Sequence, residues 1–303
     1  MSRPSRRTLV TSLGGAMAGS FASPPRAWSA QPPAAEAPTS SAAAAVAALG
    51  TTPLRRAHAH NDYEHERPLA DALSHGFTSV EADIWLIGGQ LLVGHDLEDL
   101  TPERTLEALY LDPLVARVRA NGGWVHRGHR IPLQLLIDLK NTGEETYLEL
   151  DRRLRPYRRM LTSAADGRVR TGAVTPVISG ERAARAPMEA QRLRYAFYDG
   201  RLEDLGTGVP VSFLPLVSAN WTSVFTWQGL GPMPAAERAE LREIVSAAHR
   251  DRQRVRFWAT PDTPGQAREA VWQELLSADV DHINTDDLAG LQRFLTAYDR
   301  GRA

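Results

Sequence analysis

Short runs of β-branched and other apolar residues alternate with longer amphipathic segments from Arg55 to the end of the chain. Val, Ile, Leu and Phe dominate most of the short runs, as strands buried on both faces of a parallel sheet require. The longer segments carry helical signals, and in 235–252 acidic residues come first and basic residues last, which matches the helix dipole. The pattern predicts eight strands, at 55–60, 78–84, 133–139, 174–179, 194–199, 213–218, 255–260 and 280–285.

Eight strands that alternate with helices over about 250 residues predict an α/β fold, a (β/α)8 TIM barrel. Helices are expected at Pro68–Leu73, over 235–252 and over 264–277, and a further helix is expected to begin at Thr101, with Pro102 in its first turn. A barrel of this kind carries its functional side chains at the C-terminal ends of its strands.

The first 52 residues differ in composition from the rest. Residues 1–29 combine a basic start, a short Gly- and Ala-rich stretch and a small-x-small cleavage site at Ala27-Trp28-Ser29. The order Ser-Arg-Arg-Thr-Leu at 5–9 resembles a bacterial twin-arginine export signal, so we expect a periplasmic or secreted protein. Residues 30–52 have the Ala/Pro-rich composition of a linker, which leaves 53–303 as the barrel domain.

Composition narrows the function classes. The chain has no Cys, so disulfides, thiolate metal sites and a cysteine nucleophile are excluded. Lys plus Arg total 35 against 36 Asp plus Glu, a balance that argues against a nucleic-acid binder. No apolar run reaches the roughly 18 residues that a membrane-spanning helix needs. Lys140 is the one lysine among 34 arginines, which draws attention to its position.

Pairs of polar side chains close three of the predicted strands. Each pair flanks one apolar residue, and because strand side chains alternate, both members of a pair face the same way. The barrel brings the ends of these strands to one mouth. The pairs are His58 and His60, Glu81 and Asp83, and Asp138 and Lys140.

The three carboxylates of Glu81, Asp83 and Asp138 would repel one another at this mouth unless their pKa values rise or a cation compensates them. Three oxygen ligands with room for water describe a Mg²⁺ or Ca²⁺ site. Lys140 would add a fixed positive charge for an anionic substrate. The alternative is that the acids form ordinary salt bridges with Lys140 or with the arginines at 55 and 56.

Two apolar runs flank Gly88-Gly89, which predicts a β-hairpin. The hairpin would return His95 to the neighbourhood of Asp83. His60 and His95 then form a candidate acid–base pair, because imidazoles exchange protons near neutral pH.

The order of these motifs resembles that of the phosphatidylinositol phospholipase C-like phosphodiesterases, and within them the glycerophosphodiester phosphodiesterase branch. The late segments 257–260 and 280–286 resemble the last strands of that branch. A narrower resemblance is to the altered inheritance of mitochondria protein 6 family. The segments that carry it are His58–Tyr63, Val80–Leu86, Leu92–His95 and Thr105–Leu114.

The resemblance implies a metal-dependent phosphoric diester hydrolase that acts on a glycerophosphodiester- or phospholipid-like substrate. It implies Mg²⁺ or Ca²⁺ on Glu81, Asp83 and Asp138, with His60 and His95 as base and acid. Asp138 stands where the branch has Glu, which shortens the third ligand by a methylene.

Substrate contacts are expected from four further positions. Lys140 would hold the phosphate, together with Asn61, which stands where the branch has Arg. Asn220 and Trp258 end the sixth and seventh predicted strands and are expected to line the pocket.

Three other readings stay open. One is a phospholipid lyase of the sphingomyelinase D type, for which Trp221, Phe225 and Trp227 would provide an apolar loop surface and peripheral membrane contact. Another is an amidohydrolase-type metalloenzyme, whose metal would begin with the His58-x-His60 pair. The third is a non-catalytic binding protein on the same scaffold. The pattern leaves the head group, hydrolysis against intramolecular cyclisation, and the oligomeric state open.

Overall fold

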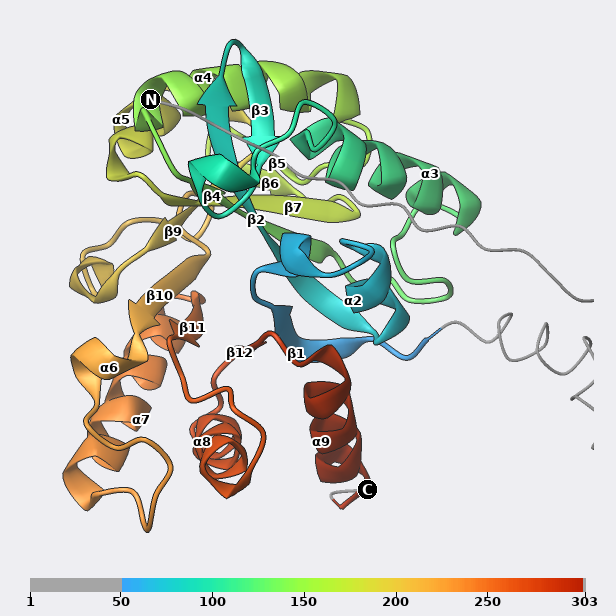
Figure 1. Ribbon diagram of the computed structural model, residues 1–303. Helices are drawn as coiled ribbons and strands as arrows, with labels where there is room; N and C mark the ends of the chain where they lie inside the picture. The colour runs from blue at the N-terminus through green and yellow to red at the C-terminus, as the bar shows by residue number, and fades with distance from the viewer. Residues whose placement is uncertain (1–50, 302–303) are drawn as a thin grey trace, which may run out of the picture. The chain divides into compact units, whose positions relative to one another are not determined.

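Eight parallel strands close on one another within residues 51–301, the part of the chain that this computed structural model describes. They follow one another round the barrel in chain order, and β12 pairs with β1 to complete the ring. The predicted TIM barrel is confirmed (Figure 1). Its strands are β1 (Leu54–Ala59), β2 (Phe77–Ile87), β4 (Leu133–Leu139), β7 (Val174–Gly180), β9 (Phe197–Gly200), β10 (Leu216–Asn220), β11 (Arg254–Trp258) and β12 (His282–Thr285).

The fifth and sixth strands begin about three residues later than the pattern predicts. The segment before β9 leaves the barrel, because β8 (Leu193–Arg194) pairs instead with β5 (Ser163–Ala165) in a small antiparallel sheet that also holds β6 (Arg168–Arg170). Ahead of β10, the buried pair Phe213 and Leu214 lies outside any strand: Phe213 ends a turn, and Leu214 follows it. Apolar residues that are buried ahead of a strand therefore give the same sequence pattern as residues of the strand itself.

Helices cover the outside of the barrel, and in Figure 1 those that follow the early strands lie on one side while the C-terminal ones lie on the other. The fifth barrel strand, β9, is an exception, because it is followed by a 3₁₀ turn at Leu202–Asp204 and not by an α-helix. No helix within residues 51–301 is both long and apolar enough to cross a membrane. The helices are α2 (Ala70–Ser74), α3 (Asp112–Ala120), α4 (Gly143–Leu154), α5 (Arg185–Glu189), α6 (Trp221–Val224), α7 (Ala235–Arg250), α8 (Gln266–Ser277) and α9 (Leu288–Arg300).

The helix predicted to begin at Thr101 starts later in the chain. Helical structure there begins with a π-helical turn at Glu107–Leu111 that runs into α3. The preceding residues are held along β3 instead, because Val93 N donates to Arg104 O at 2.7 Å and Thr105 bridges Leu92. The predictions of an export signal at 1–29 and of a linker at 30–52 lie outside the described residues, except for Thr51 and Thr52.

The predicted hairpin is confirmed. Strand β2 continues past the barrel and pairs antiparallel with β3 (Gln90–Val93). Gly88 and Gly89 make the turn with φ of 57° and 79°, values that L-residues with side chains rarely adopt. The return strand ends where Gly94 N donates to Asp83 O at 3.2 Å, so His95 lies beside Asp83.

Candidate active site

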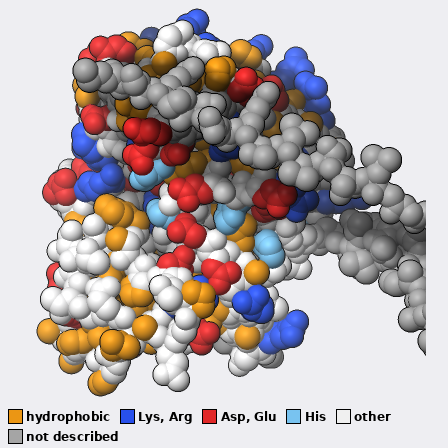
Figure 2. Space-filling model, viewed as in Figure 1, with side chains coloured by type: hydrophobic (Ala, Val, Ile, Leu, Met, Phe, Trp, Pro, Cys, Tyr) orange, Lys and Arg blue, Asp and Glu red, His pale blue; other side chains and the backbone are white. Residues whose placement is uncertain are grey.

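A cavity of about 190 Å³ lies where the barrel strands end. Its lining residues belong to the strands or to the one or two residues after them, as expected for the C-terminal mouth of a TIM barrel. Acidic and histidine side chains gather at the centre of the surface in Figure 2. The cavity is lined by His60, Asn61, Glu81, Asp83, His95, Asp138, Lys140, Ser179, Asp199, Arg201, Ser218, Arg256 and Trp258.

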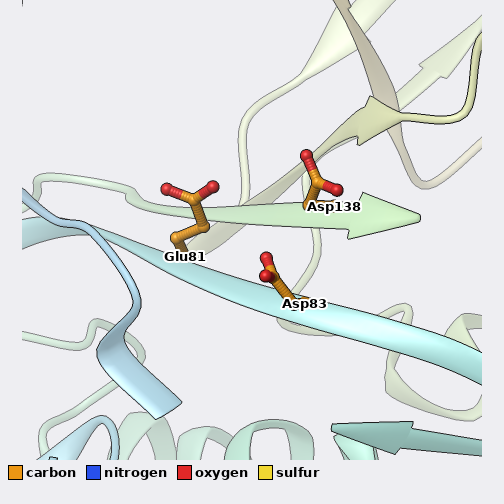
Figure 3. Close-up of side chains that lie close together, drawn as sticks. All are labelled: Glu81, Asp83 and Asp138. Atoms are coloured by element: carbon orange, nitrogen blue, oxygen red, sulfur yellow. The ribbon is translucent and has the colours of Figure 1, made fainter. Parts of the chain in front are cut away.

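Three carboxylates form the centre of this cavity. The parallel register of β2 and β4 sets Asp83 directly beside Asp138, and Glu81 lies two residues earlier on the same face of β2. One oxygen from each of the three lies within 4.8 Å of the others, and Figure 3 shows the side chains converging from two adjacent strands. Glu81 and Asp83 are almost fully buried. The alternation seen in the sequence thus brings these carboxylates together.

Gly180 makes this close approach of β4 and β7 feasible. Its φ is 76°, and a Cβ at this position would lie 2.3 Å from Leu139 O and 2.6 Å from Asp138 Oδ1. A larger residue would therefore displace the Asp138 carboxylate or the end of β4.

Two basic side chains contact the three carboxylates. Arg256 Nη2 lies 2.9 Å from Glu81 Oε2. Lys140 Nζ lies 2.8 Å from Asp83 Oδ2 and 3.3 Å from Asp138 Oδ1. The sequence left open that the acids form ordinary salt bridges with Lys140 or with the arginines at 55 and 56. The salt bridge to Lys140 is present, and the second basic partner is Arg256. Three carboxylates therefore share two basic side chains, which leaves the cluster one negative charge in excess when all three are ionised.

The pKa values of the acids reflect this imbalance. Burial raises the pKa of Glu81. The charge of Arg256 and the hydrogen bond with His58 lower that pKa by more than burial raises it, so it lies below its ordinary value. Burial raises the pKa of Asp138 to about 6 despite Lys140. Burial and the charge of Glu81 likewise raise the pKa of Asp83. The cluster therefore favours an additional proton or cation.

The donor set fits a hard divalent cation. All three groups offer carboxylate oxygens, the ligands that Mg²⁺ and Ca²⁺ prefer. Asp83 Oδ1 is buried and has no hydrogen-bond partner among the described residues. An acceptor left without a donor in this position is costly unless a cation occupies the space beside it.

His60 is held by a carboxylate that the sequence analysis did not assign to the site. Its Nδ1 lies 2.8 Å from Oδ1 of Asp286, one residue past β12. Burial lowers the pKa of His60, but the Asp286 hydrogen bond and the charge of Glu81 raise it by more, so it ends above its ordinary value. When Nδ1–H donates to Asp286, neutral His60 has an unprotonated Nε2, as a general base needs.

His95 is more exposed and has different partners. Its Nδ1 lies 3.2 Å from Asp83 Oδ2 and 3.2 Å from the hydroxyl of Tyr63. That hydroxyl donates to Asp83 Oδ2 at 2.6 Å. About half of the His95 side-chain surface is accessible, at 51%. The two histidines thus line one cavity in unlike environments, which suits unlike roles in proton transfer.

Replacing Asp286 by Asn is expected to move the acidic limb of the pH–rate profile to lower pH. The carboxylate raises the pKa of His60, so its removal keeps the imidazole neutral to a lower pH. The rate at its optimum should fall about tenfold or more, because the ring loses the partner that fixes its tautomer. The profile of kcat/KM between about pH 5 and 8 measures both effects. Asp299→Asn on α9 is the matched control, and an unmoved acidic limb in the Asp286 variant would contradict the assignment.

The remaining predicted substrate contacts divide into two groups. Asn61 and Trp258 line the cavity, and Trp258 is 38% exposed at the end of β11. Asn220 does not contribute to the lining; its Oδ1 accepts from the backbone N and the hydroxyl of Thr222, at 2.9 and 2.8 Å, and caps α6. The side-chain oxygen of Asn220 is therefore already hydrogen-bonded in the helix cap.

The apolar loop surface expected from Trp221, Phe225 and Trp227 is absent within residues 51–301, because all three side chains are buried. The rings of Trp221 and Phe225 lie 4.4 Å apart, and Trp221 Nε1 donates to Trp227 O at 2.8 Å. The aromatic residues that follow β10 belong to the hydrophobic core.

Sequence reasoning missed several polar residues of the cavity. Asp199 is fully buried and accepts from Ser179 and Ser218 at 2.8 Å and from Arg201 at 2.9 Å. The predicted strand 194–199 ended on this residue, so its place at a strand end was a signal that could have been read. Arg256 carried a readable signal, because it alternates with Trp258 on one face of β11.

Two family models match the chain. Residues 50–199 match an AIM6-like phosphodiesterase domain, and residues 254–289 match the glycerophosphoryl diester phosphodiesterase family. An altered inheritance of mitochondria protein 6 homolog from Arthroderma benhamiae is 31% identical over 255 residues, which cover 76% of this chain and 81% of that protein. The chain belongs to the altered inheritance of mitochondria protein 6 family.

Another member of this family, from Eremothecium gossypii, is 30% identical over 80% of this chain and 69% of its own length. Among solved structures, a glycerophosphoryl diester phosphodiesterase from Parabacteroides distasonis superposes with a TM-score of 0.50 over 81% of this chain and 87% of that one. Its identity is 14%, so this likeness shows a common fold.

The expected export by a bacterial twin-arginine signal is contradicted by these comparisons. The relatives from Arthroderma benhamiae and Eremothecium gossypii, and a third from Kluyveromyces lactis, are fungal proteins named for the inheritance of mitochondria. The Arg-Arg pair at 6–7 is a short pattern, and 34 of the 35 basic Lys and Arg residues are Arg, so such a pair arises readily from composition alone.

Proposed function

We propose that this chain is a metal-dependent phosphoric diester hydrolase that acts on a glycerophosphodiester- or phospholipid-like substrate. The observation that carries the proposal is the convergence of three carboxylates, Lys140 and the His60–Asp286 pair in one cavity at the mouth of the barrel. Membership of the family and the shared fold support the phosphodiesterase class.

Glu81, Asp83 and Asp138 would hold the Mg²⁺ or Ca²⁺ ion. When bound, the ion supplies positive charge beside the phosphate, which offsets the negative charge that develops as the ester reacts. Arg256 and His58 keep Glu81 ionised and in place, since both contact its Oε2, at 2.9 and 3.1 Å. His58 is itself fixed by Ser79 Oγ, 2.7 Å from its Nδ1.

His60 is the general base in this proposal. Its Nε2 takes the proton of the attacking hydroxyl, while its Nδ1–H keeps donating to Asp286 and that carboxylate stabilises the new imidazolium. His95 gives a proton to the oxygen of the leaving alkoxide. Lys140 and Asn61 hold the phosphate oxygens, with Lys140 as the cationic contact.

The three alternative functions, a lyase, an amidohydrolase-type metalloenzyme and a binding protein, have less support among the described residues. A lyase with an apolar loop surface is disfavoured by the burial of Trp221 and its neighbours. An imidazole-based metal site is disfavoured because His58 is occupied by Ser79 and Glu81, and within residues 51–301 the one candidate metal cluster consists of carboxylates. A pure binding protein has no need of the His60–Asp286 pair.

The proposal is tested by turnover of the purified protein on a panel of glycerophosphodiesters, a lysophospholipid and an aryl diester, with Mg²⁺ or Ca²⁺ and with EDTA. We expect cleavage of at least one diester with metal and none with EDTA. ³¹P NMR of the product separates a monoester, from hydrolysis, from a cyclic diester. Metal bound in calorimetry without cleavage of any diester would contradict the proposal.

A further inference from the structure

A second cavity, of about 510 Å³, lies at the opposite end of the barrel from the candidate active site. Its lining residues stand at the beginnings of barrel strands or in the loops that lead into them, so it opens at the N-terminal face. The residues that line it are Arg55, Arg56, Thr78, Ile131, Pro132, Thr162, Thr171, Thr175, Arg254, Asp281 and His282.

Arg254 is the unusual member of this cavity. Within residues 51–301 no carboxylate pairs with its guanidinium, and its hydrogen bond is to a neutral group, from Nη1 to His282 Nε2 at 3.1 Å. Burial lowers the pKa of Arg254, and the nearby charge of Asp281 raises it. The residue is partly exposed where it lines the cavity, so an anion from solvent can reach its guanidinium.

His282 adds an unused donor beside it. Because Nε2 accepts from Arg254, the imidazole proton is on Nδ1. His282 is 3% exposed, and Nδ1 has no hydrogen-bond partner among the described residues. Arg254 and His282 thus present N–H donors without enough protein acceptors to receive them.

The other charges at this cavity leave it positive. No described residue bonds the guanidinium of Arg55, which is exposed at the rim, while Arg56 is paired with Asp279. Asp281 is the carboxylate in the lining, and its Oδ2 accepts from His249 Nε2 and Val255 N, both at 2.9 Å. No hydrogen bond or ion pair among the described residues joins it to Arg254, although its charge attracts that guanidinium.

We propose that this cavity binds the phosphate group of a small organic phosphate, with Arg254 and Arg55 as its cationic contacts. The planar guanidinium matches the geometry of phosphate oxygens. A volume near 510 Å³ lies within the range of about 300–1,000 Å³ typical of small-molecule pockets, so there is room for more than the phosphate itself. The site is separate from the proposed hydrolytic centre and does not depend on its activity.

The test is calorimetric titration of the metal-free full chain with pyrophosphate in EDTA. Arg254→Gln is expected to weaken binding about tenfold or more, and Arg55→Gln several-fold, because each removes a charged hydrogen-bond donor. Arg119→Gln, an exposed arginine on α3, is the matched control and should bind as the parent does. Lys140→Gln reports on anion binding in the candidate active site and should leave this affinity unchanged.

Three results would overturn the proposal. They are an absence of saturable binding, binding lost in Lys140→Gln but retained in Arg254→Gln and Arg55→Gln, or equal binding in all variants. If Arg254→Gln does not fold by circular dichroism, Arg55→Gln decides, because its side chain is exposed and has no partner to lose. Failure of this site would leave the hydrolase proposal untouched, since Lys140 and the carboxylates lie at the other end of the barrel.

Discussion

The His60→Ala variant is expected to lose about three to four orders of magnitude in kcat/KM. Nε2 of this histidine takes the proton of the attacking hydroxyl, and no other described imidazole is paired with Asp286. The fold should survive, because the side chain lines the cavity and is 26% exposed there. Initial rates on the best substrate of the panel measure the effect.

The matched control is His129→Ala. This histidine does not line the cavity, so the variant should keep the parental rate. Added imidazole should restore part of the activity of His60→Ala, since it can enter the space that the side chain leaves. Parental turnover by His60→Ala would exclude this histidine as the base.

The Asp83→Asn variant is expected to lose about three orders of magnitude or more in rate, together with the rise in Tm that Mg²⁺ or Ca²⁺ produces. Asn retains one oxygen but lacks the charge, and Asp83 Oδ1 is the buried acceptor without a protein partner. Metal-free stability should not fall, because burial and the charge of Glu81 already raise the pKa of this carboxyl. A neutral isostere relieves that repulsion.

Thermal unfolding with and without metal, beside initial rates, separates the two effects of the Asp83 substitution. Glu98→Gln, an exposed carboxylate in the loop after His95, serves as the control and should keep both activity and the metal-dependent shift. A variant that keeps the metal-dependent rise in Tm would show that the cation binds elsewhere.

The fold was predictable because barrel strands are buried on both faces and leave a continuous apolar signal. That signal located the first residues of β1, β2, β4 and β7 to within one residue. It misplaced β9 and β10, where buried aromatic and leucine side chains precede the strand without pairing in it. Hydrophobicity reports burial, whereas hydrogen-bonded pairing in a barrel depends on neighbours distant in the sequence.

The centre of the candidate site was predictable for a geometric reason. Alternation along β2 and β4 places Glu81, Asp83 and Asp138 on the inner face, and the register of the two strands completes the cluster. The supporting contacts of Arg256 and Asp286 were not predicted. They come from β11 and the end of β12, and which strand faces which across the mouth of a barrel is not encoded in local sequence.

Titration of Mg²⁺ into the metal-free protein, with turnover and Tm followed in parallel, tests the central claim most directly. If Glu81, Asp83 and Asp138 hold the ion that serves the reaction, both signals rise from their EDTA values with one midpoint, and both rises are absent in Asp83→Asn. Full turnover in EDTA, or a rate that rises with metal in Asp83→Asn as it does in the parent chain, would contradict the account.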